Sequence, residues 1–116
     1  MSASPAAATA PNAAAESVPT LRELGGGRLA VSGALVFATA TALRALGRQT
    51  FSGSTGAIEL DLSAVGRADS AGLALLIDWL AWARQAGRTM KFSGIPAALL
   101  ALARLSDVEA VVVEGV

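Results

Sequence analysis

The segment AIELDLSAVGRADSAGLALLIDWLAWARQAG, residues 57–87, contains two different hydrophobic periods in succession. In residues 57–65, apolar and polar residues alternate, which is the pattern of a β-strand with one buried face. From about residue 70 to residue 87, apolar residues recur at helical spacing, and Gly87 is a residue suited to ending a helix. The segment therefore predicts a strand, a short turn and a long helix.

The sequence before this segment predicts a hairpin and a helix. Residues 21–35 contain two short apolar runs around the glycines 25–27, which favours two strands joined by a turn. Residues 36–49 are typical of an amphipathic helix, because apolar residues recur there at helical spacing, at Val36, Ala40, Leu43 and Leu46. Residues 51–56 are expected to form a loop.

The sequence after Gly87 predicts a strand, a helix and a last strand. The strand is expected at residues 89–95, and Pro96 then stands in the first turn of a helix, a position that proline favours. The valine-rich residues 110–116 favour the last strand. Because strands and helices alternate along the chain, the predicted fold class is α/β, a mixed and largely parallel β-sheet with about three α-helices packed on it.

The composition of the 116-residue chain argues against several classes of function. Its nine Lys and Arg residues balance nine Asp and Glu residues, so it lacks the basic excess that binding to nucleic acid or an anionic membrane requires. It contains no cysteine and no histidine, which removes thiolate metal ligands and the usual general base near neutral pH. We therefore expect no enzymatic activity, no cofactor, no metal and no nucleic-acid partner.

The first twenty residues differ in composition from the rest of the chain. Residues 1–20 are rich in Ala, Pro and Ser and lack periodic large apolar side chains, so we predict a disordered tail there. Residues 21–116 are then the folded domain. Asp78 interrupts the longest apolar stretch, so no membrane insertion is expected. The tail does not read as a secretory signal, because it begins without Lys or Arg and prolines interrupt an alanine run that is too weakly apolar. The expected location is the cytoplasm.

Two apolar stripes run along the predicted helix at residues 70–87. The stripe expected to face the sheet comprises Leu73, Leu76, Ile77, Leu80 and Ala83. The second stripe, on roughly the opposite side, comprises Leu75, Trp79, Trp82 and Ala86. We favour an exposed second stripe that binds a protein partner, because tryptophan is enriched at the energetic centres of interfaces. The alternative is that a neighbouring helix covers it.

An acidic residue and a hydroxyl residue, Asp69 and Ser70, stand where this helix is expected to begin. A side-chain oxygen at that position accepts a hydrogen bond from a free backbone N–H, which stabilises a helix by about 0.5–2 kcal/mol. Capping by one of the two residues leaves the other available to contact a partner. The pattern therefore indicates a capped helix start, with or without a docking role.

The strand ending in Asp61-Leu62-Ser63, the loop, and the run Asp69-Ser70-Ala71-Gly72-Leu73 together resemble the signature of the STAS domain family. In that signature a strand ends in D-L-S, and Asp, Ser or Thr, a small residue, Gly and Leu then open an apolar helix. The likeness continues through KFSGIPAALLALARLSDVEAVV and covers about residues 21–116. It implies a STAS-like arrangement of the mixed, largely parallel sheet.

Two branches of the STAS family have different hydroxyl residues at the helix start. In the anti-sigma-factor antagonists, a kinase phosphorylates a Ser or Thr immediately before the Gly. This chain has Ala71 at that position, which carries no hydroxyl. An antagonist or scaffold in a partner-switching pathway is therefore the second of the two functions that the resemblance implies.

The chain is more similar to the MlaB-like branch, the STAS subunit of a phospholipid-transport ABC system. The run Gly72-Leu73-Ala74-Leu75-Leu76 matches that branch, as does the hydroxyl of Ser70 after Asp69. The resemblance implies a non-catalytic subunit that docks on the transporter's ATPase, in the cytoplasm and peripheral to the inner membrane. The implied partner-binding residues are Ser70, Asp69, Ala71, Leu75, Trp79 and Trp82.

Overall fold

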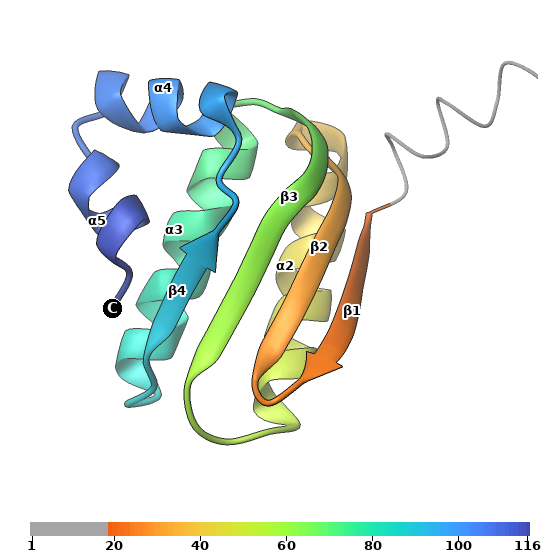
Figure 1. Ribbon diagram of the computed structural model, residues 1–116. Helices are drawn as coiled ribbons and strands as arrows, with labels where there is room; N and C mark the ends of the chain where they lie inside the picture. Colours follow the sequence, from red (N-terminus) through yellow and green to blue (C-terminus); the bar gives the residue numbers. More distant parts are fainter. Residues whose placement is uncertain (1–18) are drawn as a thin grey trace, which may run out of the picture.

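The computed structural model describes residues 19–116 as one sheet with helices packed on it (Figure 1). In chain order the elements are β1 (Thr20–Gly25), β2 (Arg28–Leu35), α2 (Phe37–Ser52), β3 (Ile58–Ala68), α3 (Ser70–Gln85), β4 (Met90–Ser93), α4 (Ala97–Leu105) and α5 (Glu109–Glu114). Most of the predicted tail, residues 1–18, lies outside the described residues. Thr20, which we placed in the tail, is the first residue of β1.

The four strands lie in the order β1-β2-β3-β4. The hairpin of β1 and β2 is antiparallel, while β3 runs parallel to both of its neighbours. The predicted mixed, largely parallel sheet is therefore confirmed. Because β2, β3 and β4 point the same way, α2, α3 and α4 all begin at one end of the molecule, which is the upper end in Figure 1.

The two faces of the sheet differ in polarity, as the alternation in residues 57–65 predicts. In β3, Ile58, Leu60 and Leu62 are buried, whereas Glu59 and Asp61 between them are partly exposed. Both α2 and α3 lie on the apolar face, as Figure 1 shows, and no helix of residues 19–116 lies on the polar face. Burial of the alternate apolar side chains against these two helices forms the core.

The two helices on the sheet also pack against each other, and this contact buries the second stripe of α3. Trp79 is fully buried and meets the Phe51 ring of α2 edge-on, with 5.4 Å between ring centroids. The Trp79 Nε1–H points to the Arg44 carbonyl at 3.5 Å. The expectation that Leu75 and Trp79 form an exposed surface is therefore wrong, because α2 covers them.

A glycine in α2 allows the two helices to approach this closely. A Cβ atom on Gly47 would lie 2.5 Å from the Trp79 indole, closer than non-bonded carbon atoms approach. The buried face of α2 consists of Thr39, Leu43, Gly47 and Phe51. Leu46, which we expected on that face, is exposed instead. The Trp79 indole, which packs against Gly47, therefore determines which face of α2 is buried. The sequence does not indicate this, because glycine has no apolar side chain.

The end of α3 follows the prediction. Gly87 has φ 70° and donates its N–H to the Arg84 carbonyl, while the next N–H, of Arg88, is donated to the Ala83 carbonyl. These two bonds satisfy carbonyls that the last turn of a helix leaves free, and the left-handed conformation favours glycine.

The last predicted strand, residues 110–116, is wrong, because this part of the chain forms the short helix α5. Of its consecutive valines only Val112 is buried. Gly115, with φ 75°, then turns the chain so that Val116 exchanges two backbone hydrogen bonds with Met90 of β4. The β-propensity of valine favours a strand here, but the chain instead forms a helix that buries Val112. Only Val116 then pairs with β4.

We predict that Gly47→Ala destabilises the domain, although alanine is the better helix former by about 1 kcal/mol. The added methyl group would force α2 away from the buried indole, and overpacking of this kind outweighs the propensity. The expected result is a fall in the free energy of unfolding of roughly 1–2 kcal/mol. Guanidinium chloride unfolding, followed by tryptophan fluorescence, measures it.

Gly66→Ala is the matched control, since a Cβ atom at Gly66 of β3 meets no heavy atom within 4 Å. Its free energy of unfolding should change by no more than about 0.5 kcal/mol. A Gly47→Ala variant as stable as wild type would show that the two helices do not interlock at this position.

Candidate functional site

One carboxylate at the upper end of the molecule joins the starts of two helices. Asp69 Oδ1 accepts the backbone N–H groups of Ala71 at 2.8 Å and of Gly72 at 3.2 Å, in the first turn of α3. Its other oxygen, Oδ2, accepts the N–H of Phe37 at 3.1 Å, in the first turn of α2. The predicted cap of α3 is confirmed, and the same side chain also caps α2.

Backbone packing holds this cap against the end of β2. The Asp69 N–H is donated to the Leu35 carbonyl at 3.2 Å. A Cβ atom at Gly72 would lie 2.1 Å from that same carbonyl oxygen. Only glycine lets the first turn of α3 lie this close to β2, which explains the Gly that follows Asp69-Ser70-Ala71.

The surroundings of Asp69 favour its ionised form. Partial burial alone would raise its pKa, but the N–H groups of Phe37, Gly72 and Ala71, together with the charge of Arg67, outweigh burial and hold the pKa below its ordinary value. The carboxylate is therefore charged near neutral pH, and a charge at two helix N-termini is favoured by both helix dipoles.

The residues after Asp69 lie at the edge of this cap. Ser70 is the first residue of α3 and its side chain is exposed. Ala71 is half-buried and faces the neighbouring helix α2 across a groove. The structure therefore brings Asp69, Ser70 and Ala71 together at one surface, as their adjacent positions and the capped helix start predict.

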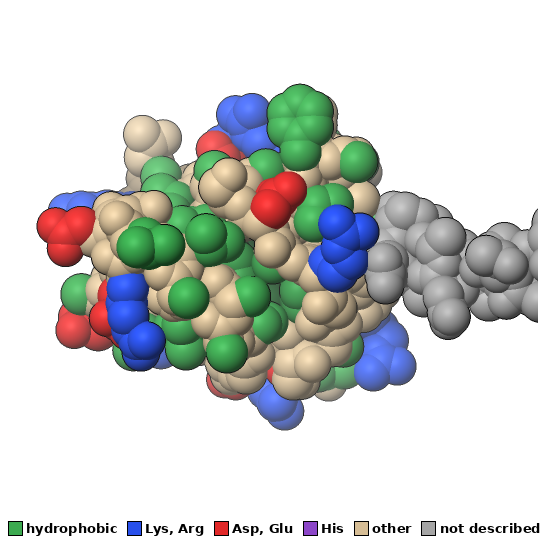
Figure 2. Space-filling model, turned by 90° about the horizontal axis from the view of Figure 1, so that it is seen from above, with side chains coloured by type: hydrophobic (Ala, Val, Ile, Leu, Met, Phe, Trp, Pro, Cys, Tyr) green, Lys and Arg blue, Asp and Glu red, His purple; other side chains and the backbone are tan. Residues whose placement is uncertain are grey.

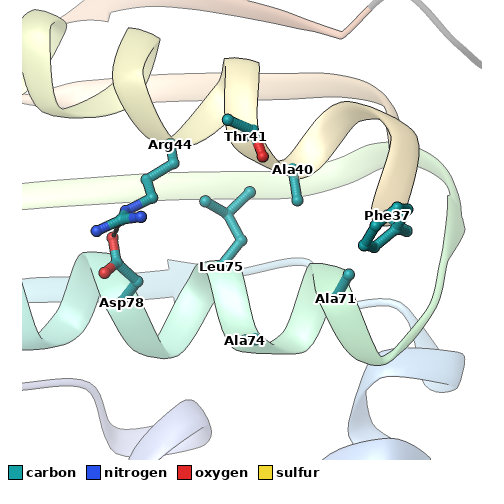
Figure 3. Close-up of a pocket in the computed structure, with 8 residues that line it drawn as sticks. All are labelled: Phe37, Ala40, Thr41, Arg44, Ala71, Ala74, Leu75 and Asp78. Atoms are coloured by element: carbon teal, nitrogen blue, oxygen red, sulfur yellow. Dashed lines mark ion pairs between the residues drawn. The ribbon is translucent and has the colours of Figure 1, made fainter.

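A groove of about 380 Å³ runs between the first halves of α2 and α3 (Figure 3). It is lined by Phe37, Ala40, Thr41, Arg44, Ala71, Ala74, Leu75 and Asp78. Small side chains form most of the wall near the helix starts, and Phe37, which is 83% exposed, stands at the mouth. An apolar side chain or chain segment from another source would fit here, because it would cover Phe37 and the methyl groups together.

Ion pairs form the far end of the groove. Asp78 of α3 lies between two arginines of α2, with its Oδ2 3.2 Å from Arg44 Nε and its Oδ1 2.9 Å from Arg48 Nη2. The polar strip that Asp78 marks on α3 thus faces α2. The charged side chains thus lie at one end of the groove, and the end near Asp69 is its apolar part.

The structure places the six predicted partner-binding residues in three different environments. Asp69, Ser70 and Ala71 lie at the accessible upper end, whereas Leu75 and Trp79 are buried between α2 and α3. Trp82 is half-buried near the lower end, between the Phe51 ring and the guanidinium of Arg88. An exposed tryptophan surface beside Ser70 is therefore wrong.

Sequence reasoning missed the residues that α2 contributes to this site. Phe37, Ala40 and Thr41 belong to a helix that the sequence analysis used only as a packing element. The available signal was Phe37 itself, a large aromatic residue next to Val36, which we took as the first residue of the buried face. The hydrogen bond from its N–H to Asp69 joins positions 32 residues apart, which sequence pattern does not indicate.

The upper end presents a surface of mixed polarity. Seen from above in Figure 2, hydrophobic side chains are scattered over this end among polar side chains and backbone, and charged side chains lie both between them and at the margin. Within residues 19–116, no three acidic side chains lie together as ligands for a metal ion. The arrangement is thus suited to contact with another protein surface.

Comparison with protein families assigns this fold and motif. The protein-family model described as "Mlab, STAS domain" matches residues 21–114 of this chain. The chain belongs to the STAS domain family. A search of curated proteins gives no significant match.

Two solved structures confirm the STAS fold. The first is "Structure of the Anti-Sigma Factor Antagonist SpoIIAA in its Unphosphorylated Form", with a TM-score of 0.58 and 13% identity over 76% of this chain and 83% of that one. The second is a sulfate transporter family protein from Wolinella succinogenes, with a TM-score of 0.61 and 17% identity over 82% of this chain and 77% of that one. At these identities the likeness concerns the fold.

STAS domains are in general non-catalytic domains that mediate protein–protein interactions. In the described part of this STAS domain, none of the helices has the length and apolar character needed to cross a membrane. Membership of the STAS family therefore agrees with a protein-binding role for the surface around Asp69.

We predict that Asp69→Asn removes a pH-dependent part of the stability of this STAS domain. Because the pKa of Asp69 is lowered on folding, its ionisation stabilises the folded state above the ordinary aspartate pKa, and this contribution is lost as pH falls through the folded-state pKa. The difference in unfolding free energy between wild type and Asp69→Asn should therefore shrink as the pH falls from about 5, through the ordinary aspartate pKa and on through the lower folded-state pKa.

Urea unfolding across this pH range measures the difference. Asp69→Ala, which removes both acceptor oxygens, should cost about 1–2 kcal/mol at neutral pH, in the range of strong helix caps. A difference between wild type and Asp69→Asn that stays constant with pH would mean that the carboxylate charge does not stabilise the two helix starts.

Proposed function

We propose that this STAS domain is a non-catalytic subunit that docks on the ATPase of a phospholipid-transporting ABC complex and supports its assembly and activity. The observation that carries the proposal is the exposed Ser70 followed by Ala71 at a firmly capped helix start. This is the pattern of the MlaB-like branch, and the matching family model carries that description. The subunit would lie in the cytoplasm, peripheral to the inner membrane through the complex, where it helps maintain outer-membrane lipid asymmetry.

The geometry supports docking through the upper end. Asp69 fixes the starts of α2 and α3, so the partner meets a surface whose shape is already set. A preformed surface loses little conformational entropy on binding. Ser70 offers a hydroxyl, and Phe37 with the groove beside it offers apolar area. An effect on ATP turnover then requires that the domain bind one state of the ATPase more tightly than another.

The second function, an antagonist or scaffold in a partner-switching pathway, has one observation in its favour. Ser70 is an exposed hydroxyl at a helix N-terminus, where a phosphate is favoured by free N–H groups and the helix dipole. Against it, position 71, which carries the modified hydroxyl in the antagonist branch, is alanine. The transporter function is therefore the one we propose.

We predict that Ser70→Arg abolishes docking without unfolding the domain, because the longer charged side chain projects from an exposed position into the partner. Affinity purification of the tagged chain from native cytoplasm and membranes should recover an ABC ATPase and permease with wild type. With Ser70→Arg, binding should weaken by at least about tenfold, or 1.4 kcal/mol.

Ser52→Arg is the matched control, an exposed serine at the opposite end of α2. It should retain the ATPase as wild type does. Retention by Ser70→Arg would remove Ser70 from the interface, and recovery of a serine kinase or an anti-sigma factor in place of the ATPase would favour the second function.

A further inference from the structure

Two adjoining cavities lie between the second half of α3 and the C-terminal segment that contains α5, away from the helix starts at Asp69 (Figure 1). Both are lined by Arg84, Val111 and Val116, and together they form what we call the α3–α5 cleft. The larger cavity measures about 460 Å³ and the smaller about 200 Å³. The larger one alone is within the usual size range of ligand sites, roughly 300–1,000 Å³.

The two parts of the α3–α5 cleft differ in polarity. Apart from Arg84, the smaller cavity is lined by apolar side chains alone, those of Ile77, Leu80, Ala81, Val111 and Val116. The polar side chains that line the larger cavity are Arg84, Arg88 and Thr89. Within residues 19–116, no acidic side chain lines either cavity. The cleft therefore has an apolar end and a cationic end.

Arg84 lies where the two cavities meet, and its guanidinium is exposed. Within the part of the chain that the structure describes, this guanidinium forms no hydrogen bond and no ion pair. Arg88, by contrast, donates to the backbone carbonyls of Phe51 and Gly56. The helix dipole favours a cation in the last turn of α3, but this interaction does not use the guanidinium's N–H groups. The donors of Arg84 are thus available to a carboxylate, which a guanidinium binds through two parallel hydrogen bonds.

We propose that the α3–α5 cleft binds a single-chain fatty-acyl anion, with the carboxylate on Arg84 and the acyl chain in the apolar cavity. The chain would cover apolar surface that the fold leaves in water, including Val111, which is 38% exposed. Ile77 and Arg84 are seven positions apart, or about 10 Å along the helix axis, which suits one chain of medium length.

A free amphiphile fits these observations better than a lipid within a bilayer. The charges of the chain balance, so the protein has no general electrostatic attraction to an anionic membrane surface. The site lies apart from the docking surface at Asp69, and the proposal does not depend on the function proposed for that surface.

Titration of the full, isotope-labelled chain with decanoate, followed by NMR, tests the proposal. The measurement is made at a pH where the carboxylate is ionised and below the concentration at which decanoate forms micelles. We expect saturable shifts of the amide signals of Ala81, Arg84 and Val111, and none at Ala40 and Ala71 in the groove between α2 and α3. The absence of saturable shifts, or larger shifts at that groove, would overturn the proposal.

Two arginine variants and an uncharged probe make the test specific. Arg84→Gln should raise the dissociation constant for decanoate by about tenfold or more, because the paired charge is lost. Arg22→Gln, at an exposed arginine of β1, is the matched control and should change it by no more than about twofold. Decanol, which has no carboxylate, should bind wild type and Arg84→Gln equally.

A substitution at the apolar end completes the test. Ala81 is exposed on α3, so Ala81→Trp should leave the domain folded while its indole fills the smaller cavity. It should weaken decanoate and decanol alike. Equal affinity of decanoate for wild type and Arg84→Gln, or unchanged binding by Ala81→Trp, would contradict the proposed site. All these readouts are obtained without the ATPase, so a failed docking experiment leaves them unchanged.

Discussion

The arrangement of the helices depends on the carboxylate of Asp69, which accepts three backbone N–H groups from two helix starts. The first N–H groups of any helix have no partner within the helix, so an acceptor placed between two helices fixes both. Asp69, together with the close approach of Gly72 to Leu35, fixes where α2 and α3 begin relative to each other, and hence the upper end of the groove between them.

The same two helices interlock at the other end of their contact, where the Trp79 indole lies against Gly47. Between these two points the ion pairs of Asp78 with Arg44 and Arg48 hold the helices together. The upper end is therefore a rigid surface, because α2 and α3 below it are packed firmly against each other. Rigidity of this kind suits a domain whose family role is to contact other proteins, because little order has to be gained on binding.

The sequence was sufficient where local chemistry decides the structure. The cap at Asp69, the end of α3 at Gly87 and the alternation in β3 depend on residues close together in the chain, and each was predicted. The burial of Trp79 was not, because helical spacing shows which residues share a face but not what covers that face. Gly47, which admits the indole, has no side chain to indicate it, and the valines of α5 favour a strand that packing overrides.

Hydrogen exchange of the domain, alone and in complex with the ATPase of the ABC transporter, tests the central claim most directly. The account predicts that binding slows exchange at residues 37–44 and 70–75, where α2 and α3 begin, and leaves the polar face of the sheet unchanged. Protection confined to that polar face, or to α4 and α5, would contradict a docking surface organised by Asp69.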